Sequence, residues 1–170
     1  MNWKKDLMMI GGLMLAVVAL LIFGQTTGNL PTDTFENSSN SARVSKSQTI
    51  PVKINNATIN AEIADENDER SKGLSNRETL DPNLGMLFVF NEEGQHSFWM
   101  KETKFALDII WISKDKKIVD IAYAVPEPGV KNSDLTVYKP SSNAVYVLEV
   151  LGGTVNSKGI LIGQTTEFSL

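Results

Sequence analysis

The stretch TIPVKINNATINAEI, residues 49–63, decides the fold of this chain. On either side of Asn55-Asn56, apolar residues alternate with polar ones, as in strands that bury one face. The alternating apolar positions are Ile50, Val52, Ile54, Ala57, Ile59, Ala61 and Ile63. Two such runs about a two-residue Asn-Asn loop predict a β-hairpin, because asparagine tolerates the positive φ angles of tight hairpin turns.

Short strands are predicted along the rest of the chain as well. Residues 65–72 are polar, begin acidic, end basic and stop at Gly73, which predicts a short helix. Further strands are predicted at residues 86–90, 98–100, 108–113, 117–125, 145–151 and within 160–168, with a turn at 91–95 and a helical turn at 154–158. Many short strands with one short helix indicate a mostly β domain.

The N-terminal segment has the layout of a membrane anchor. Leu7 to Phe23 carries no charge, and 17 apolar residues extend about 26 Å as a helix, close to the thickness of a hydrocarbon core. A cleaved signal peptide is the alternative, but the residues that follow show no small-x-small cleavage pair. Lys4 and Lys5 precede the run and the next basic residue is Arg43, so the N-terminus is predicted in the cytoplasm. We therefore expect a single-pass cell-membrane protein with an extracytoplasmic C-terminal domain.

Composition divides the chain into three parts. Residues 1–24 are the predicted anchor, residues 25–48 a flexible linker rich in Ser, Thr and Asn, and residues 49–170 one β-rich domain. Asn37 and Asn56 lie in glycosylation sequons, and whether either is used depends on the cell.

Residue content excludes several classes of chemistry. The chain has no cysteine and a single histidine, His96, which rules out thiol nucleophiles, disulfides and multi-histidine metal sites. His96 follows a glycine turn and is predicted to be a solvated loop residue. The formal net charge of −4 argues against nucleic acid as a partner. We predict no metal and no cofactor.

A series of ordered motifs resembles the family called domain of unknown function 192. The motifs are Glu69-Arg70-Ser71-Lys72-Gly73-Leu74 followed by Arg77, Gly85-Met86-Leu87-Phe88-Val89-Phe90, Phe98-Trp99-Met100-Lys101-Glu102-Thr103, Leu107-Asp108-Ile109, and Val147-Leu148-Glu149-Val150 with Gly152-Gly153. The resemblance covers about Ile50 to Phe168. It implies a small β-rich domain with a β-sandwich or jelly-roll-like fold, often exported or membrane-tethered in prokaryotes. The family carries no established reaction.

Two arginines and two carboxylates are the first candidate site residues. Arg70 and Arg77 suit bidentate binding of a carboxylate or phosphate. Asp108 and Glu149 lie in apolar strands, so each is predicted to be buried and to need a partner. The alternative is that each arginine only locks the helix onto the sheet through one of these carboxylates.

The apolar triplet Phe98-Trp99-Met100 supplies the remaining candidates. Trp99 is a predicted platform for a sugar or another flat ligand, and ordinary core packing is the alternative. Lys101 and Thr103 continue the same segment and complete the candidate ligand-binding set of Arg70, Arg77, Trp99, Lys101, Thr103, Asp108 and Glu149.

Three functions stay open at the level of sequence. The first is a noncatalytic ligand-binding or accessory module for a small molecule or carbohydrate. The second is a hydrolase of glycosidic type with Asp108 and Glu149 as its acid and base. The third is a purely structural envelope protein. The sequence favours binding, because signatures of a nucleophile, a metal or a cofactor are missing, but it does not decide whether the protein is an enzyme.

Overall fold

The hairpin predicted at residues 49–63 is present in the computed structural model, which describes residues 49–170. β1 (Thr49–Ile54) and β2 (Ala57–Ala64) pair antiparallel, with Val52 opposite Ile59. Asn55 adopts a φ of 52° in the turn, as tight hairpin turns require. The β-hairpin predicted at residues 49–63 is therefore confirmed.

Five further strands join this hairpin in one sheet. They are β3 (Leu84–Gly94), β4 (Leu107–Ile112), β5 (Ile118–Ala124), β6 (Ala144–Leu151) and β7 (Thr166–Glu167). The hydrogen-bonded order is β5-β4-β6-β3-β2-β1-β7. Three short helices complete the described chain: α2 (Asn67–Lys72), the 3-10 helix η1 (Asn132–Asp134) and α3 (Thr154–Lys158).

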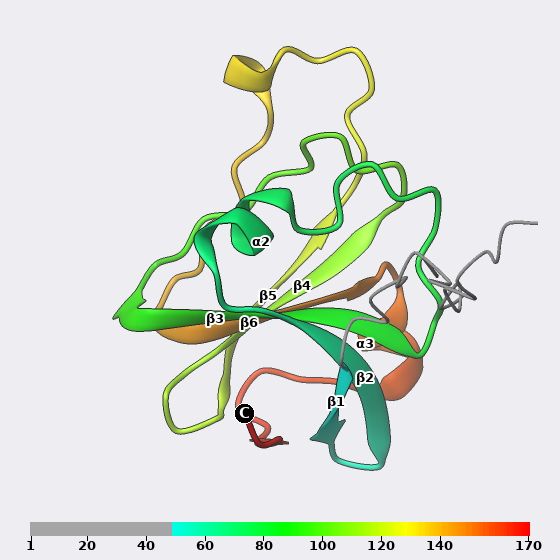
Figure 1. The fold of residues 1–170 in the computed structure, drawn as a ribbon. Coiled ribbons are helices and arrows are strands. Elements are labelled where there is room, and N and C mark those ends of the chain that lie inside the picture. The colour runs from blue at the N-terminus through cyan, green and yellow to red at the C-terminus, as the bar shows by residue number, and fades with distance from the viewer. Residues whose placement is uncertain (1–48) are drawn as a thin grey trace, which may run out of the picture. The chain divides into compact units, whose positions relative to one another are not determined.

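The mostly β class with a short helix is confirmed, but the arrangement of strands differs from a sandwich or jelly roll. The strands described here are hydrogen-bonded into a single curled sheet (Figure 1). Apolar alternation reports only which side of each strand is buried, and it is the same whether strands lie in one curled sheet or in two packed sheets. Strand order depends on long-range pairing, which the alternation does not encode.

The pairing of β2 with β3 is parallel, whereas the other strand pairs run antiparallel. A parallel pair cannot be joined by a tight turn and needs a crossover connection. The chain between β2 and β3 makes this crossover and includes α2, which lies over one face of the sheet (Figure 1). This crossover places a polar helix beside the central strands.

Both faces of the sheet bury apolar side chains. One core cluster includes Val52, Ile59, Leu87, Ile110, Leu148 and Val150, closed by Ile160 and Phe168. The other, on the α2 side, includes Met86, Phe88, Ile109, Trp111 and Val147, closed by Leu74 and Met100. Adjacent residues of β4 and β6 therefore point into different cores.

Helix α2 has the predicted ends but contributes no buried residue. Glu66 and Glu69 form a reciprocal capping box at its start. Gly73 ends it with a φ of 48°, and a Cβ at this position would lie 3.3 Å from the Phe88 ring. Glycine is therefore favoured both by backbone conformation and by close packing on the sheet.

Two segments differ from their predictions. Residues 91–94 continue β3 to Gly94 and do not form a turn. Residues 98–100 contribute one isolated bridge, between Phe98 and Tyr138, and no regular strand. Phe98 and Met100 pack on the α2-side core while Trp99 between them is exposed, and an apolar run of this kind cannot be distinguished from a short strand by sequence alone.

The predicted anchor and linker, residues 1–48, lie outside the described residues. Among residues 49–170, no helix is long and apolar enough to cross a membrane.

Candidate functional site

A cleft of about 440 Å³ opens on the α2 side of the sheet. Its walls come from α2 and the residues after it, from β3, from the segment 96–103 and from one residue of β6. Its polar lining consists of Asn67, Arg70, Ser71, Lys72, Ser75, His96, Ser97, Lys101, Thr103 and Glu149, and its aromatic lining of Phe88, Phe90, Phe98 and Trp99. The crossover that carries α2 thus forms one side of the cleft.

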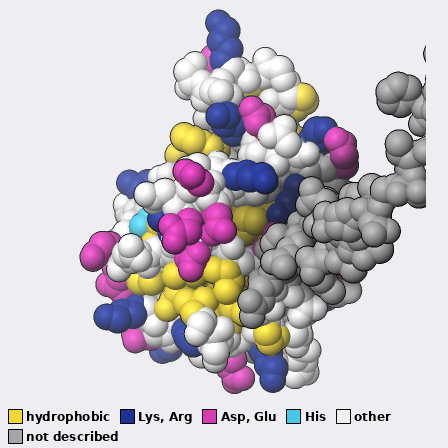
Figure 2. All heavy atoms as spheres, viewed as in Figure 1, with side chains coloured by type: hydrophobic (Ala, Val, Ile, Leu, Met, Phe, Trp, Pro, Cys, Tyr) yellow, Lys and Arg dark blue, Asp and Glu magenta, His cyan; other side chains and the backbone are white. Residues whose placement is uncertain are grey.

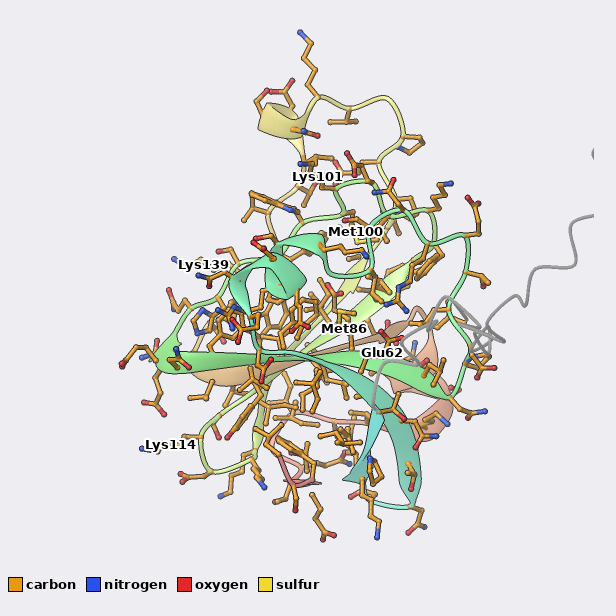
Figure 3. The ribbon with its side chains drawn as sticks, in the orientation of Figure 1. Glu62, Met86, Met100, Lys101, Lys114 and Lys139 are labelled. Carbon is orange, nitrogen blue, oxygen red and sulfur yellow. The ribbon has the colours of Figure 1, made fainter. Side chains whose placement is uncertain are left out.

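Glu149 is the β6 residue of this cleft. It pairs with Met86 of β3 and with Ile109 of β4, so its side chain shares their face of the sheet. Figure 3 marks Met86 at the level of the sheet, with Met100 and Lys101 on the side that carries α2. Glu149 is only 4% exposed.

The carboxyl of Glu149 forms no hydrogen bond or ion pair with any other residue in the range 49–170. No fully buried side-chain oxygen or nitrogen in that range lacks a partner, so the Glu149 oxygens must reach the solvent of the cleft. Burial raises the pKa of Glu149 from 4.5 to about 8, because desolvation disfavours the charged form. At neutral pH the site therefore holds a protonated carboxyl that can both donate and accept a hydrogen bond.

Arg70 holds α2 against the sheet. Its Nη1 donates to the carbonyl oxygen of Val89 at 2.9 Å and to that of Asp65, and its Nη2 donates to Asn67 Oδ1 at 2.5 Å. Its guanidinium also lies 5.5 Å from the centre of the Phe90 ring, a cation–π distance. The prediction that an arginine locks the helix to the sheet fits Arg70, although its partners are backbone oxygens and an amide, not a carboxylate.

Lys101 is presented to the cleft by a fixed backbone. The carbonyl oxygen of Lys101 accepts hydrogen bonds from Ser75 Oγ at 2.9 Å and from Thr103 Oγ1 at 3.3 Å. Its ammonium group forms no ion pair or hydrogen bond within residues 49–170, while the side chain is half-buried. The cleft thus contains a cation that the described protein does not neutralise.

Aromatic rings build the floor and the rim. Phe90 stacks on His96 with ring centres 3.6 Å apart, and Phe98 meets Phe88 edge-on at 4.9 Å. His96 lies in the loop after β3, as predicted, and is partly exposed; its ring stacks on Phe90, and its Nε2 lies 3.0 Å from the Glu92 carbonyl oxygen. Trp99 is 56% exposed and lines the cleft. The predicted aromatic platform is therefore accessible, and the core alternative for Trp99 does not hold.

Asp108 lies on the opposite face of the sheet from Glu149. It pairs with Val150, the neighbour of Glu149 in β6, and strand neighbours point to opposite faces. Asp108 Oδ2 accepts a hydrogen bond of 2.7 Å from the backbone N–H of Val155, in the first turn of α3. This carboxylate satisfies one of the free donors at a helix start and is a structural group.

Arg77 is also outside the cleft. Its two terminal nitrogens donate to the two carboxylate oxygens of Glu62 at 2.8 and 2.7 Å. The hydrogen bonds to Glu62 raise the pKa of Arg77 above its ordinary value, more than burial lowers it. The predicted bidentate binding by Arg77 thus occurs within the protein, and its partner is a residue of β2 that the sequence pattern did not single out.

Five of the seven predicted site residues meet at one cleft: Arg70, Trp99, Lys101, Thr103 and Glu149. Arg77 and Asp108 do not join them. Sequence reasoning missed the hydroxyl and amide lining, for which no signal exists in a single sequence, because serines and asparagines are common in polar turns. Within residues 49–170 no three acidic or histidine side chains are grouped to hold a metal ion.

Around the cleft, charge is unevenly distributed. Figure 2 shows acidic side chains gathered over the region of α2, with basic ones beside them. The lining itself contains Arg70, Lys72 and Lys101 against Glu149 as its one carboxyl group. The interior of the cleft is therefore more positive than its surroundings.

Comparison with known proteins gives a family and a fold. The model of the family domain of unknown function 192, described as "Uncharacterized ACR", matches residues 50–168. A crystal structure of a protein of unknown function from Novosphingobium aromaticivorans is 32% identical with a TM-score of 0.65, covering 74% of this chain and 89% of that one. A second, of a candidate transcription regulator from Sinorhizobium meliloti, is 29% identical with a TM-score of 0.62, covering 71% and 92%. No curated protein sequence matches.

Proposed function

The chain belongs to the domain of unknown function 192 family, and on that premise we propose that it is a noncatalytic ligand-binding or accessory module. Its ligand is a small polar molecule, of which carbohydrates are one class, bound in the cleft beside α2. The predicted anchor at residues 1–24 and linker at residues 25–48 hold the domain on the outer side of the cell membrane.

One observation carries this proposal: a buried carboxyl without a partner on the wall of an open cleft. Buried polar groups in folded proteins are hydrogen-bonded in the great majority of cases, to protein or to water, so a carboxyl that is 4% exposed and has no protein partner within residues 49–170 takes its hydrogen bonds from whatever fills the cleft. The side chain of Glu149 forms no hydrogen bond to another described residue and lines the cleft. A ligand that completes these hydrogen bonds accounts for the arrangement.

The lining supports a ligand of mixed polar and flat character. Trp99 at the rim offers an aromatic face, and Ser97 and Thr103 offer hydroxyl groups nearby. Ligand sites typically combine aromatic surface with a few convergent polar groups. A sugar ring, which has one apolar face and a polar edge, has the complementary character.

The glycosidic hydrolase receives no support from the same geometry. Its proposed acid and base, Asp108 and Glu149, project from opposite faces of one sheet and cannot flank one bond. Asp108 is moreover engaged with the start of α3.

A ligand screen by thermal shift tests the proposal. Binding to the folded state raises the melting temperature in proportion to the logarithm of ligand concentration over Kd. The screen should compare the wild-type protein with Glu149→Ala and with Glu102→Ala, whose side chain lies outside this cleft. A compound that stabilises wild type and Glu102→Ala but not Glu149→Ala supports the proposal, and equal stabilisation of all three proteins contradicts it.

A further inference from the structure

The charges that line the cleft restrict the chemistry of its ligand. Arg70, Lys72 and Lys101 contribute three cationic groups, and Glu149 contributes the one carboxyl. Residues 49–170 as a whole carry more acidic than basic side chains, so this excess of cations is a local feature. Clefts lined by one sign of charge attract ligands of the other sign.

Lys101 distinguishes the cleft from an ordinary charged surface. Arg70 already donates hydrogen bonds to Val89, Asp65 and Asn67, and its guanidinium makes a cation–π contact with the Phe90 ring. The ammonium group of Lys101, a residue that is half-buried, has no such partner among the described residues. An anionic group forms strong, charge-assisted hydrogen bonds with an ammonium that has no protein partner.

Glu149 faces the same cleft but makes no ion pair with Lys101, although the two groups have opposite formal charges when Glu149 is ionised. Both residues line one cleft, whose volume of about 440 Å³ is large enough for a small organic molecule. A protonated Glu149 can donate one hydrogen bond into that space.

Building on the proposed binding function, we infer that the cleft selects a small organic anion, with a carboxylate held between the Lys101 ammonium and the protonated carboxyl of Glu149. Trp99 packs against the body of such a ligand. A uronic acid has this combination of a carboxylate and a sugar ring.

Affinity should depend on the protonation of Glu149. The titratable and charged groups facing it are Arg70 and Lys72 from α2, and His96 and Lys101 from the segment after β3. On its own face of the sheet, Glu62 of β2 lies two strands away and is paired with Arg77. The raised pKa of Glu149, about 8, leaves its proton in place at neutral pH.

A cationic ligand bound to ionised Glu149 is the competing arrangement. It places a positive charge among the cationic side chains of Arg70, Lys72 and Lys101, which disfavours it. The two arrangements predict opposite pH dependence, since the anion needs protonated Glu149 and the cation needs it ionised.

The test uses matched pairs of acid and neutral probe with the full chain. D-glucuronate is compared with D-glucose, and benzoate with benzyl alcohol, by NMR titration of protein labelled with ¹³C at glutamate carboxyl carbons. The glutamate signals report the protonation of Glu149 directly, and Glu149→Gln assigns its resonance.

We expect at least one acid to bind ten times or more tightly than its neutral partner at pH 6. Bound acid should raise the pKa of Glu149, because the ligand carboxylate favours the neutral form. Affinity should fall about tenfold for each pH unit above that pKa, whereas Glu149→Gln should bind with little change between pH 6 and 9. Lys101→Met should weaken acid binding at least tenfold, and the control Lys104→Met, whose lysine pairs with Glu78 outside this cleft, should not.

The outcomes separate the two proposals. Equal binding of acid and neutral probes, or a lowered Glu149 pKa with ligand, overturns the anion inference and leaves the binding function standing. Tighter binding of a cationic probe, methylammonium, at high pH also overturns the inference. No binding by any probe, together with an unchanged Glu149 signal, rejects both proposals.

Discussion

Replacing Glu149 by glutamine should stabilise the protein, and by an amount that depends on pH. Glutamine has nearly the same shape and keeps a donor and an acceptor, but it cannot be charged. Because Glu149 is buried, ionising it at high pH opposes the folded state, and glutamine removes that cost.

The magnitude follows from the pKa of Glu149. Its value is about 8 in the folded protein against 4.5 for the unperturbed group, and each unit is equivalent to about 1.4 kcal/mol. Since the folded pKa is the higher one, the folded state binds the proton more tightly. The protonated Glu149 carboxyl therefore contributes its full stabilisation below pH 4.5. This contribution to the unfolding free energy decreases as the pH rises, and above pH 8 about 5 kcal/mol of it is lost. At pH 7 the loss is about 3 kcal/mol.

Urea unfolding at pH 4.5, 7 and 8.5 measures this effect, since the difference in unfolding free energy between Glu149→Gln and wild type cancels the titration of all other groups. The difference should be near zero at pH 4.5 and should rise to about 3 and about 5 kcal/mol in favour of glutamine at the higher pH values. A difference that stays constant with pH would falsify the assignment of Glu149 as a buried, unpartnered carboxyl. A variant less stable than wild type at pH 8.5 would show that the ionised form has a partner in the fold.

Three further outcomes check other parts of the structure. Asp108→Ala should lower the unfolding free energy by about 1 to 3 kcal/mol, because the Val155 N–H loses its acceptor, and Asp108→Asn should lower it less; thermal unfolding measures both. Gly152→Ala should be markedly more destabilising than Gly153→Ala, because a Cβ at Gly152 would lie 2.8 Å from the Ala106 Cβ, whereas at Gly153 it would meet no atom within 4 Å and only the φ of 88° is unfavourable. Protease added to intact cells should digest the C-terminal domain and leave the N-terminus, and protection of the domain until lysis would contradict the predicted orientation.

Local features of the fold could be predicted from sequence, and long-range ones could not. The β1–β2 hairpin, the α2 stop at Gly73 and the β4–β5 hairpin depend on neighbouring residues and are confirmed. The parallel β2–β3 pairing and the single sheet depend on contacts between distant segments, for which alternation carries no information. β7 is two residues long, too short to have a periodic pattern of its own.

The candidate site shows the same division. Glu149 could be identified because an acidic residue in a run such as Tyr146 to Leu151 is unusual, whichever way the strand faces. Asp108 is likewise an acidic residue in an apolar strand, but its role is structural. The sequence could not distinguish the two residues, because it does not show which face of the sheet each side chain lies on. The ion pair of Arg77 with Glu62 joins β2 to the crossover, and its partner could be found only with the topology in hand.

Glu149 relates the stability of this domain to its proposed function. A penalty of about 5 kcal/mol above pH 8 is comparable to the whole unfolding free energy of an ordinary domain, about 5 to 15 kcal/mol. A purely structural role does not explain a buried carboxyl at position 149, because glutamine or an apolar residue would fit β6 with a smaller loss of folding free energy. A ligand that completes the hydrogen bonds of the protonated carboxyl offsets the penalty only when bound, and sites of this kind trade stability for binding. The decisive experiment therefore measures both the thermal stability and the ligand affinity of Glu149→Gln. If the variant unfolds at a higher temperature but its affinity for every ligand that stabilises wild type changes with pH just as that of wild type does, the carboxyl has no part in binding and the proposed site is wrong.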